Sequence, residues 1–218
     1  MVKVVDRGIA CGSQSISSSR CFIFSALFIC LGCLVGCVRV STQTSQTTYH
    51  SISPKQRQQT AAKITSWNIT GAFSVVRNQK ALLANYQWRQ SGKQFIIQIA
   101  GALNIAATTL MGRPGHVTLR QSAAKVFQAS SAEVLMQQQL GWYVPVSYLK
   151  YWIRGLSAPG RHKATFDRYG HLIALKQQGW TIDFSKYQTN QGVDLPKMLR
   201  LSRPRLRVKL VVKQWHIH

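Results

Sequence analysis

The sequence predicts an α+β fold in which an antiparallel sheet of about ten or eleven strands is interrupted by a pair of helices. Apolar and polar residues alternate with period two before residue 120 and again after residue 160, which is typical of antiparallel strands joined by hairpins. Between these blocks, apolar residues recur at helical spacing. Each predicted strand has one apolar face, so the sheet must curl round or be covered.

The N-terminal residues have the features of an export signal. Residues 21–35 carry no charge and are almost entirely apolar, and three basic residues precede them. A membrane span needs about 20 apolar residues, so this shorter stretch fits a signal peptide, although an uncleaved signal anchor is the alternative. The sequence LVGC at residues 34–37 resembles the bacterial lipobox, in which the cysteine is acylated and becomes the new N-terminus.

The cysteines also favour lipidation at Cys37. All five lie at or before this position, so cleavage leaves a mature chain with one thiol. Exported domains use cysteines in pairs, as disulfides, and here there is no pair to make. We therefore expect a lipoprotein signal peptide over 1–36, a lipidated flexible tether over 37–53 and one domain over 54–218. Several acyl chains on Cys37 give a stable anchor.

The mature chain is strongly basic. The whole sequence has a net charge of +23, and loss of Lys3, Arg7, Arg20 and Asp6 with the signal leaves +21. A basic surface attracts phosphate, whether from nucleic acid or from anionic lipid. The cations are scattered along the chain rather than gathered in one motif, and a tethered exported protein lies beside a membrane. We therefore expect lipid headgroups, and no nucleic acid, as the polyanionic partner.

The first block of the domain combines one polar helix with several strands. Ser53-Pro54 has the pattern of a helix start, and a helix is expected to about Ile64. Strands are expected around 67–75, 82–88 and 95–99, where turn residues at 78–79 and 91–92 separate the runs. A further turn is expected at 113–115, before Val117 and Leu119.

Two helices follow, and then the strand pattern resumes. Ser130 and Glu133 have the spacing of a capping box, and Gly141 is expected to end that helix. A second helix is expected from Pro145, and Gly155 lies near its end. A turn is expected at 167–170, a strand pair on either side of Gly179, and a last strand with one apolar and one cationic face over 205–213.

The sequence indicates no enzyme. The mature chain has four acidic residues, Glu133, Asp167, Asp183 and Asp194, and no two are close enough in sequence to predict a carboxylate pair. Nucleotide-binding, zinc-protease and serine-hydrolase motifs are absent, and two isolated Ser-x-x-Lys matches lack their companion motifs. Two histidines near the C-terminus are too few for a metal site. We expect neither cofactor nor metal.

Several segments resemble the LolB family of outer-membrane lipoproteins. They are GWYVPVSYLKYWIRG at 141–155, FDRYGHL at 166–172, QQGW at 177–180, LPKMLRL at 195–201 and the strand that ends at Trp215. The resemblance implies an unclosed antiparallel β-barrel of about 11 strands, with a helical lid that encloses an apolar cavity. It also implies a monomer on the periplasmic face of the outer membrane, which accepts acylated lipoproteins from the carrier LolA. Val38, rather than Asp, after Cys37 agrees with that location.

The resemblance also points to candidate site residues. The family has an exposed leucine in a loop between two strands, which helps to insert cargo into the inner leaflet. The matching residues here are 101–104 (GALN), so Leu103 is retained while the usual Pro and Gly are not. The alternative is that Leu103 packs at a strand end. A barrel interior can be a packed core or a lipid receptacle, and the resemblance favours acyl-chain contact by Trp67, Phe73, Tyr86, Trp88, Phe95, Leu149, Trp152 and Trp180.

Overall fold

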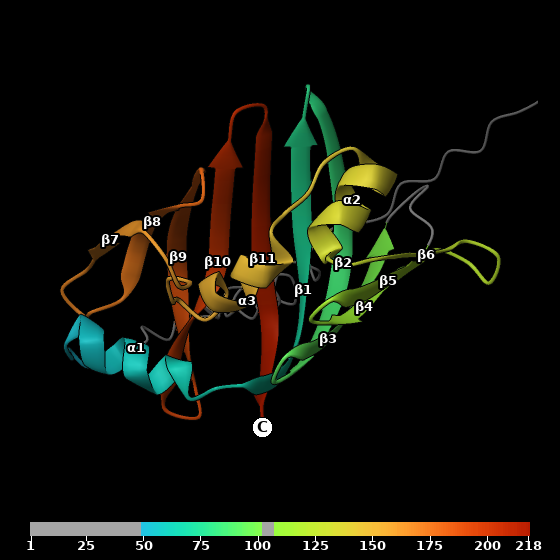
Figure 1. The fold of residues 1–218 in the computed structure, drawn as a ribbon. Coiled ribbons are helices and arrows are strands. Elements are labelled where there is room, and N and C mark those ends of the chain that lie inside the picture. Colours follow the sequence, from blue (N-terminus) through green and yellow to red (C-terminus); the bar gives the residue numbers. More distant parts are fainter. Residues whose placement is uncertain (1–48, 102–106) are drawn as a thin grey trace, which may run out of the picture. The chain divides into compact units, whose positions relative to one another are not determined.

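One sheet of eleven antiparallel strands forms the body of the protein in the computed structural model, which describes residues 49–101 and 107–218 (Figure 1). The strand order is β6-β5-β4-β3-β2-β1-β11-β10-β9-β8-β7, so β6 and β7 are the two edges and the sheet is not closed. This confirms the predicted fold class of an unclosed antiparallel sheet with helices. The helices are α1 (Pro54–Ala62), α2 (Ala132–Leu140) and α3 (Val146–Trp152).

The strand bounds match the runs of alternating residues in the sequence. On one half of the sheet they are β1 (Ser66–Arg77), β2 (Lys80–Ser91), β3 (Gln94–Gly101), β4 (Thr108–Arg113), β5 (His116–Arg120) and β6 (Val126–Ala129). On the other half they are β7 (His162–Phe166), β8 (Leu172–Gln177), β9 (Trp180–Asn190), β10 (Val193–Arg203) and β11 (Leu206–Ile217).

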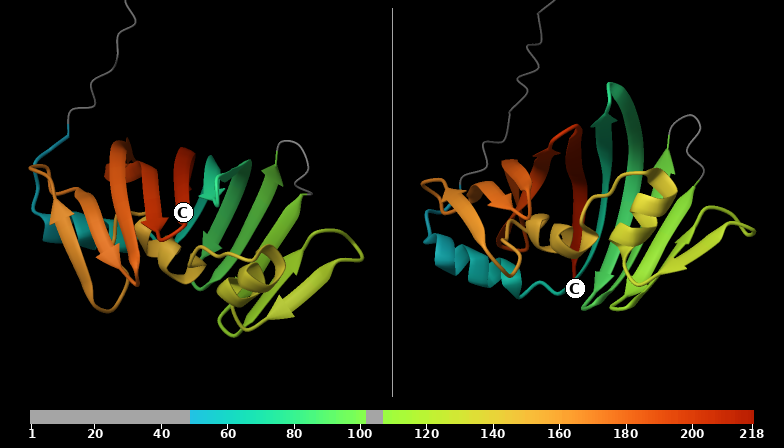
Figure 2. Two further views of the ribbon diagram at one scale, coloured as in Figure 1. Left: turned by 90° about the horizontal axis from the view of Figure 1, so that it is seen from above. Right: turned by 45° about the horizontal axis from the view of Figure 1, so that its top comes forward.

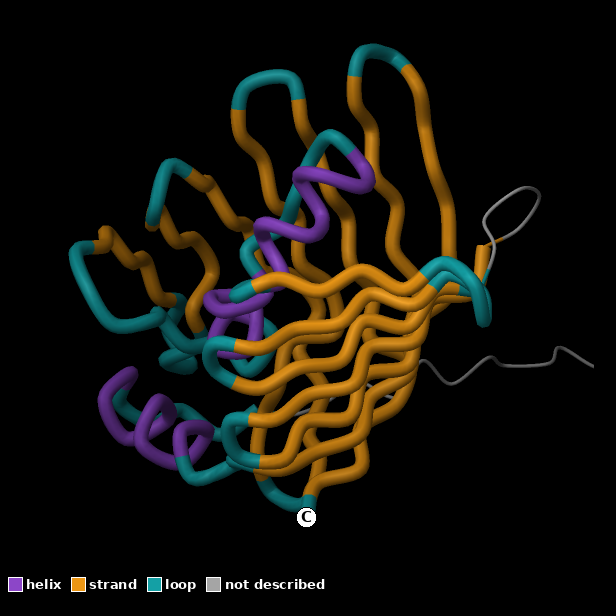
Figure 3. The backbone as a smooth tube through the Cα atoms, turned by 45° about the vertical axis from the view of Figure 1, so that its right-hand side comes forward, coloured by secondary structure: helices purple, strands orange, loops and turns teal. Residues whose placement is uncertain are grey.

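The topology explains why the helices cover one face of the sheet. Strands that follow one another in sequence are neighbours in the sheet, except where β6 at one edge must connect to β7 at the other. Residues 130–161 make that connection and contain α2 and α3, which lie across the concave face of the curved sheet (Figures 2 and 3). The first and last strands, β1 and β11, pair along their whole length at the centre of the sheet.

The concave face carries the hydrophobic core. Along β11, Leu206, Val208, Leu210 and Val212 are buried while the basic residues between them are exposed, as the alternation predicts. The same inward pattern continues on β10 with Leu199 and Leu201. Burial of these side chains contributes about 25 cal/mol per Å² of apolar surface to holding the sheet and the helices together.

The helix ends agree with the sequence prediction except at one position. Ser53 caps α1, where its Oγ accepts a hydrogen bond from the backbone N–H of Gln56, and Gly141 ends α2 in a left-handed conformation. The predicted capping box of α2 is wrong by one residue, because the cap is Ser131 and not Ser130. The Ser131 Oγ accepts from the N–H of Val134.

Glu133 has a different role from the predicted one. Its carboxylate accepts hydrogen bonds from the backbone N–H and the hydroxyl of Ser147, at 3.0 and 2.9 Å. Ser147 lies in the first turn of α3, whose N-cap residue, Pro145, makes no side-chain cap. Glu133 of α2 therefore supplies the acceptor that the first turn of α3 lacks, and it ties the two helices of the lid together.

We expect Glu133→Ala to destabilise the domain by about 1 kcal/mol, because the first turn of α3 loses a charged cap. Urea unfolding followed by circular dichroism measures this. Ser131→Ala, which removes the cap of α2, is the matched variant, and the double variant tests whether the two losses add. Unchanged stability in Glu133→Ala would show that the lid helices do not depend on this contact.

The described residues all belong to one compact unit, Gln46–His218. Cys37 and Leu103 lie outside the described residues. Among the helices of the described ranges, none is long and apolar enough to cross a membrane.

Candidate functional site

An apolar pocket of about 440 Å³ lies between the concave face of the sheet and the helical lid. This volume is in the range of small-molecule binding sites. Strands on both sides of the β1–β11 pair and the lid segment 136–149 contribute its walls. The lining residues are Phe73, Val75, Leu82, Tyr86, Trp88, Ile97, Ile99, Thr108, Leu110, Met136, Gln139, Trp142, Val144, Val146, Leu149, Leu201, Val208 and Leu210. None of them is charged, so the pocket suits hydrocarbon rather than a polar ligand.

The burial of the lining residues locates the mouth of the pocket. Val75, Trp88, Leu110, Leu201 and Val208 are buried and form the interior. The half-buried lining residues lie at one end of the pocket. They come from the parts of β1 to β4 that lie toward the β1–β2 turn, and from the end of α2. These residues are Phe73, Leu82, Ile99, Thr108, Gln139 and Trp142. The pocket therefore opens where α2 meets that end of the sheet.

One wall of the pocket depends on a glycine. The register of β1 against β11 shifts between Thr70 and Gly71, and the Tyr86 ring lies across this position. A Cβ at residue 71 would overlap the carbonyl oxygen of Val211 and lie 2.7 Å from the Tyr86 ring. The Tyr86 hydroxyl donates to that carbonyl at 3.3 Å, and burial raises the pKa of Tyr86 well above its ordinary value. Tyr86 is therefore a neutral wall residue.

The structure brings four of the eight candidate lining residues to this pocket: Phe73, Tyr86, Trp88 and Leu149. The other four lie elsewhere. For those on strands, alternation fixes the face of a side chain but not what covers it, and Trp152 lies in α3. Trp67 packs between Trp88 and Trp215, with ring centroids 6.2 and 6.1 Å away, and the Trp152 indole donates to Gln177. Neither Trp67 nor Trp152 lines the pocket, so contact of these two residues with acyl chains stays a prediction.

The remaining two candidates are also outside the pocket. Trp180 is buried beneath the guanidinium of Arg203, whose Cζ is 5.1 Å from the ring centroid. Phe95 is half-buried against the core, near Gly112 on the neighbouring strand, and lines a separate surface groove. In their place the lid supplies Met136, Trp142, Val144 and Val146, which the sequence prediction missed. The apolar residues at 144, 146 and 149 were the feature of the sequence that could have identified this part of the lining.

A buried charge cluster lies on the other half of the sheet. Arg57 of α1 forms an ion pair with Asp194 of β10 at 2.5 Å, and its other nitrogens donate to the backbone carbonyls of Tyr169 and His50. The Asp194 carboxylate also lies 3.0 Å from Nε2 of His171. Arg57 therefore fastens α1 and the segment before it to β10 and to the turn between β7 and β8.

His171 joins two carboxylates that are distant in sequence. Its Nδ1 lies 3.1 Å from Asp167 and its Nε2 faces Asp194, and only the protonated ring donates to both. Burial alone raises the pKa of Asp194, but hydrogen bonds from Thr189 and His171 and the charge of Arg57 outweigh it and hold that pKa below its ordinary value. Burial is likewise the first influence on Asp167, and hydrogen bonds from His171 and Tyr169 lower its pKa overall.

This cluster is structural rather than catalytic in its geometry. His171 is 1% exposed, and the rings of Tyr49, Tyr169 and Tyr187 surround it, with Tyr187 stacked at 4.1 Å. It shares no residue with the apolar pocket. Within the described ranges, no group of three or more His, Cys, Asp or Glu is placed to hold a metal ion.

The fold and the pocket define a class of protein: an unclosed antiparallel barrel whose helical lid covers an uncharged apolar pocket. Residues 65–215 match the family model of the outer membrane lipoprotein LolB. The chain belongs to the outer membrane lipoprotein LolB family, whose members are non-catalytic.

Similar proteins agree with this assignment. The outer-membrane lipoprotein LolB of Coxiella burnetii strain RSA 493 is 48% identical over 181 residues, which are 83% of this chain and 86% of that protein. The LolB of Francisella tularensis strain WY96-3418 is 33% identical over 93% of this chain and 98% of its own. A LolA superfamily protein from Nitrosomonas europaea has the same fold, with a TM-score of 0.52 and 10% identity over 77% of this chain and 94% of that one.

Proposed function

We propose that this protein accepts acylated lipoproteins from a LolA-like periplasmic carrier and releases them into the outer membrane, with the acyl chains held in the apolar pocket. The observation that carries the proposal is an uncharged pocket of about 440 Å³ beneath the lid of a LolB-family chain. Each methylene that enters it gains about 0.8 kcal/mol relative to water. Passage between two apolar pockets needs no nucleotide, because a small difference in affinity directs the transfer.

The anchor and the location are part of the same proposal. Acylation of Cys37 tethers the domain, as a monomer, to the inner leaflet of the outer membrane, and Val38 leaves the lipoprotein free of an inner-membrane retention signal. The names of the Coxiella and Francisella relatives support the outer membrane. Recovery of the protein with the inner membrane after fractionation would contradict this location.

A transfer experiment tests the function. A soluble form that begins at Val38 contains the compact unit and lacks the lipid, and it is mixed with carrier that holds a labelled lipoprotein. We expect the label to move to this protein during size-exclusion chromatography. If the label stays with the carrier, the rival explanation holds, in which the chain is a lipid-surface lipoprotein that accepts no cargo.

We expect Leu103→Glu to separate release from acceptance. We propose Leu103 as a membrane-inserting residue, and burial of one leucine side chain in a bilayer contributes roughly 1.5 to 3 kcal/mol. The variant should accept cargo normally and keep its melting temperature but deliver cargo poorly to liposomes. A large fall in melting temperature would place Leu103 in the core instead. Normal delivery with normal stability would contradict the membrane-inserting role.

A further inference from the structure

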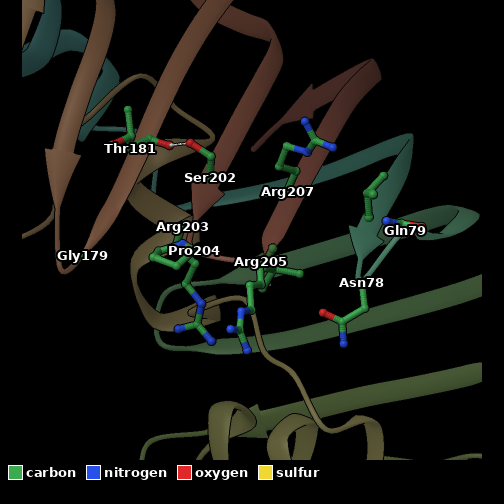
Figure 4. A pocket seen from close by; sticks show the side chains of 11 residues that line it. Asn78, Gln79, Gly179, Thr181, Ser202, Arg203, Pro204, Arg205 and Arg207 are labelled. Atoms are coloured by element: carbon green, nitrogen blue, oxygen red, sulfur yellow. Dashed lines mark hydrogen bonds between the residues drawn. The ribbon is translucent and has the colours of Figure 1, made fainter.

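Five cations gather where the β1–β2 and β10–β11 turns lie beside each other. Arg77 pairs with Lys80 across the first turn and with Leu206 of β11 on its other side. Arg203, Arg205 and Arg207 surround the second turn, and the three line one surface groove together with residues of the first turn (Figure 4). We call Arg77, Lys80, Arg203, Arg205 and Arg207 the basic tip.

Among the residues that the structure describes, no carboxylate neutralises the basic tip. The four described acidic side chains are elsewhere: Asp167 and Asp194 lie in the buried cluster, Glu133 caps α3, and Asp183 pairs in register with Arg200. In the ranges 49–101 and 107–218, no ion pair involves a residue of the basic tip. The positive field at this end of the sheet is therefore uncompensated, and a polyanion is attracted to it.

Ring contacts hold one of these cations in place, and a second occupies an unusual backbone conformation. The Arg203 guanidinium lies over the rings of Tyr143 and Trp180, with its Cζ 4.6 and 5.1 Å from their centroids. Arg205 follows Pro204 in the turn and has a φ of 63°, a conformation that favours glycine. An arginine thus occupies a turn position whose backbone conformation glycine adopts more readily.

The basic tip continues directly from the apolar pocket. Val75, Leu201 and Val208 line the pocket, and Arg77 and Arg203 follow two residues further along β1 and β10. Two residues of a strand span about 7 Å. The basic tip therefore begins about 7 Å beyond the pocket lining, a distance on the scale of a lipid headgroup region. On the outer face of the same β1–β2 hairpin, three register positions from the Arg77–Lys80 pair, Leu83 is 62% exposed.

We propose that the basic tip docks the protein on a bilayer surface through the phosphates of anionic phospholipids. Arginine guanidinium groups suit phosphate oxygens, and the exposed Leu83 suits the headgroup boundary. This inference rests on the proposed function, because docking at this end places the pocket close to the bilayer that receives the cargo. It concerns a surface outside the pocket, so it can fail while the proposed function stands.

Vesicle co-sedimentation of the soluble form tests the proposal. The tip variant is Arg205→Gly with Arg207→Gln. The control is Lys186→Gly with Lys197→Gln, which removes the same charge from exposed positions on β9 and β10, and Lys186 also has a positive φ, of 56°. Each cation near an anionic surface strengthens binding roughly five-fold, so the tip variant should bind phosphatidylglycerol vesicles roughly 30-fold more weakly. The control should change binding much less, and phosphatidylcholine vesicles should not distinguish the two.

Two further binding measurements distinguish lipid phosphate from free phosphate and from nucleic acid. Inorganic pyrophosphate should not displace the protein from vesicles, and duplex DNA should bind the two variants equally. Equal losses in tip and control variants would overturn the proposal, because general charge then explains binding. Tip-dependent binding of DNA or pyrophosphate without vesicle binding would overturn it as well. The tip variant should accept cargo from the loaded carrier as the wild type does. If the wild-type protein itself accepts no cargo, the proposed function is refuted, and not the docking proposal.

Discussion

Asp194→Ala is expected to destabilise the domain by about 3 to 5 kcal/mol, because it breaks a buried ion pair by removing one partner. Asp194 is the shared partner of Arg57 and His171, which are 8% and 1% exposed. Its removal leaves Arg57 buried without a carboxylate and His171 with Asp167 alone, and α1 loses its ion pair with β10. Urea unfolding at neutral pH measures the change.

Asp183→Ala is the matched control, because Asp183 is exposed on the strand next to β10 and its register neighbour Arg200 is exposed as well. A change within about 0.5 kcal/mol is expected there. Equal effects at the two positions would show that the buried cluster contributes no more to stability than an exposed carboxylate.

The pH dependence of the unfolding free energy is a second test of the same buried charge cluster. The folded-state pKa values of Asp167 and Asp194 are held below their ordinary values, which lie near 4. A depressed carboxyl pKa adds stability that is present above the unfolded-state pKa and is lost as the pH falls through the folded-state pKa. Acid should therefore destabilise the wild type in this window, and Asp194→Ala should show a weaker dependence.

Leu82→Trp is expected to weaken acyl-chain binding roughly 30-fold. Leu82 is half-buried at the mouth of the pocket, and an indole there takes the space of two or three methylenes. At about 0.8 kcal/mol each, the loss is about 2 kcal/mol. Since the new side chain fills space that a ligand would occupy, the melting temperature should not fall. Titration with a fluorescent fatty acid measures the affinity.

The neighbouring residue supplies the control for this substitution. Leu83 points to the opposite face of β2 and is 62% exposed, so Leu83→Trp adds the same group outside the pocket. Its affinity for the fatty acid should equal that of the wild type. A loss in both variants would indicate a general effect on β2, and a loss in neither would place the ligand elsewhere.

The strands were predictable from local pattern because each one is half-buried. Leu206, Val208 and Leu210 alternate with basic residues, and this alone identifies a strand with a core face. The register shift at Gly71 was not predictable, since the residues that crowd this position, Val211 and Tyr86, come from the two neighbouring strands. The capping error at α2 has a simple cause: Ser130 and Ser131 are both suitable caps, and Glu133 turned outward to α3.

The site was predictable only in part, because local pattern does not show what covers a strand face. Period two correctly assigns Trp67 and Trp88 to the same face, yet the Arg154 guanidinium lies over the Trp67 ring, 5.0 Å from its centroid, and only Trp88 lines the pocket. The buried charge cluster left no local signal, because Arg57 and Asp194 are 137 residues apart in the chain. Such contacts depend on the order of strands in the sheet, which local sequence pattern does not contain.

The central claim is that acyl chains of the cargo enter the pocket beneath the lid, and photo-crosslinking tests it most directly. A lipoprotein with a diazirine near the end of one acyl chain is loaded on the carrier, transferred to this protein and irradiated, and the labelled peptides are mapped by mass spectrometry. The account predicts label on the pocket-lining parts of β1 to β4 and on residues 136–149 of the lid. Label confined to the outer face around Leu83, or none on this protein after transfer, would contradict it.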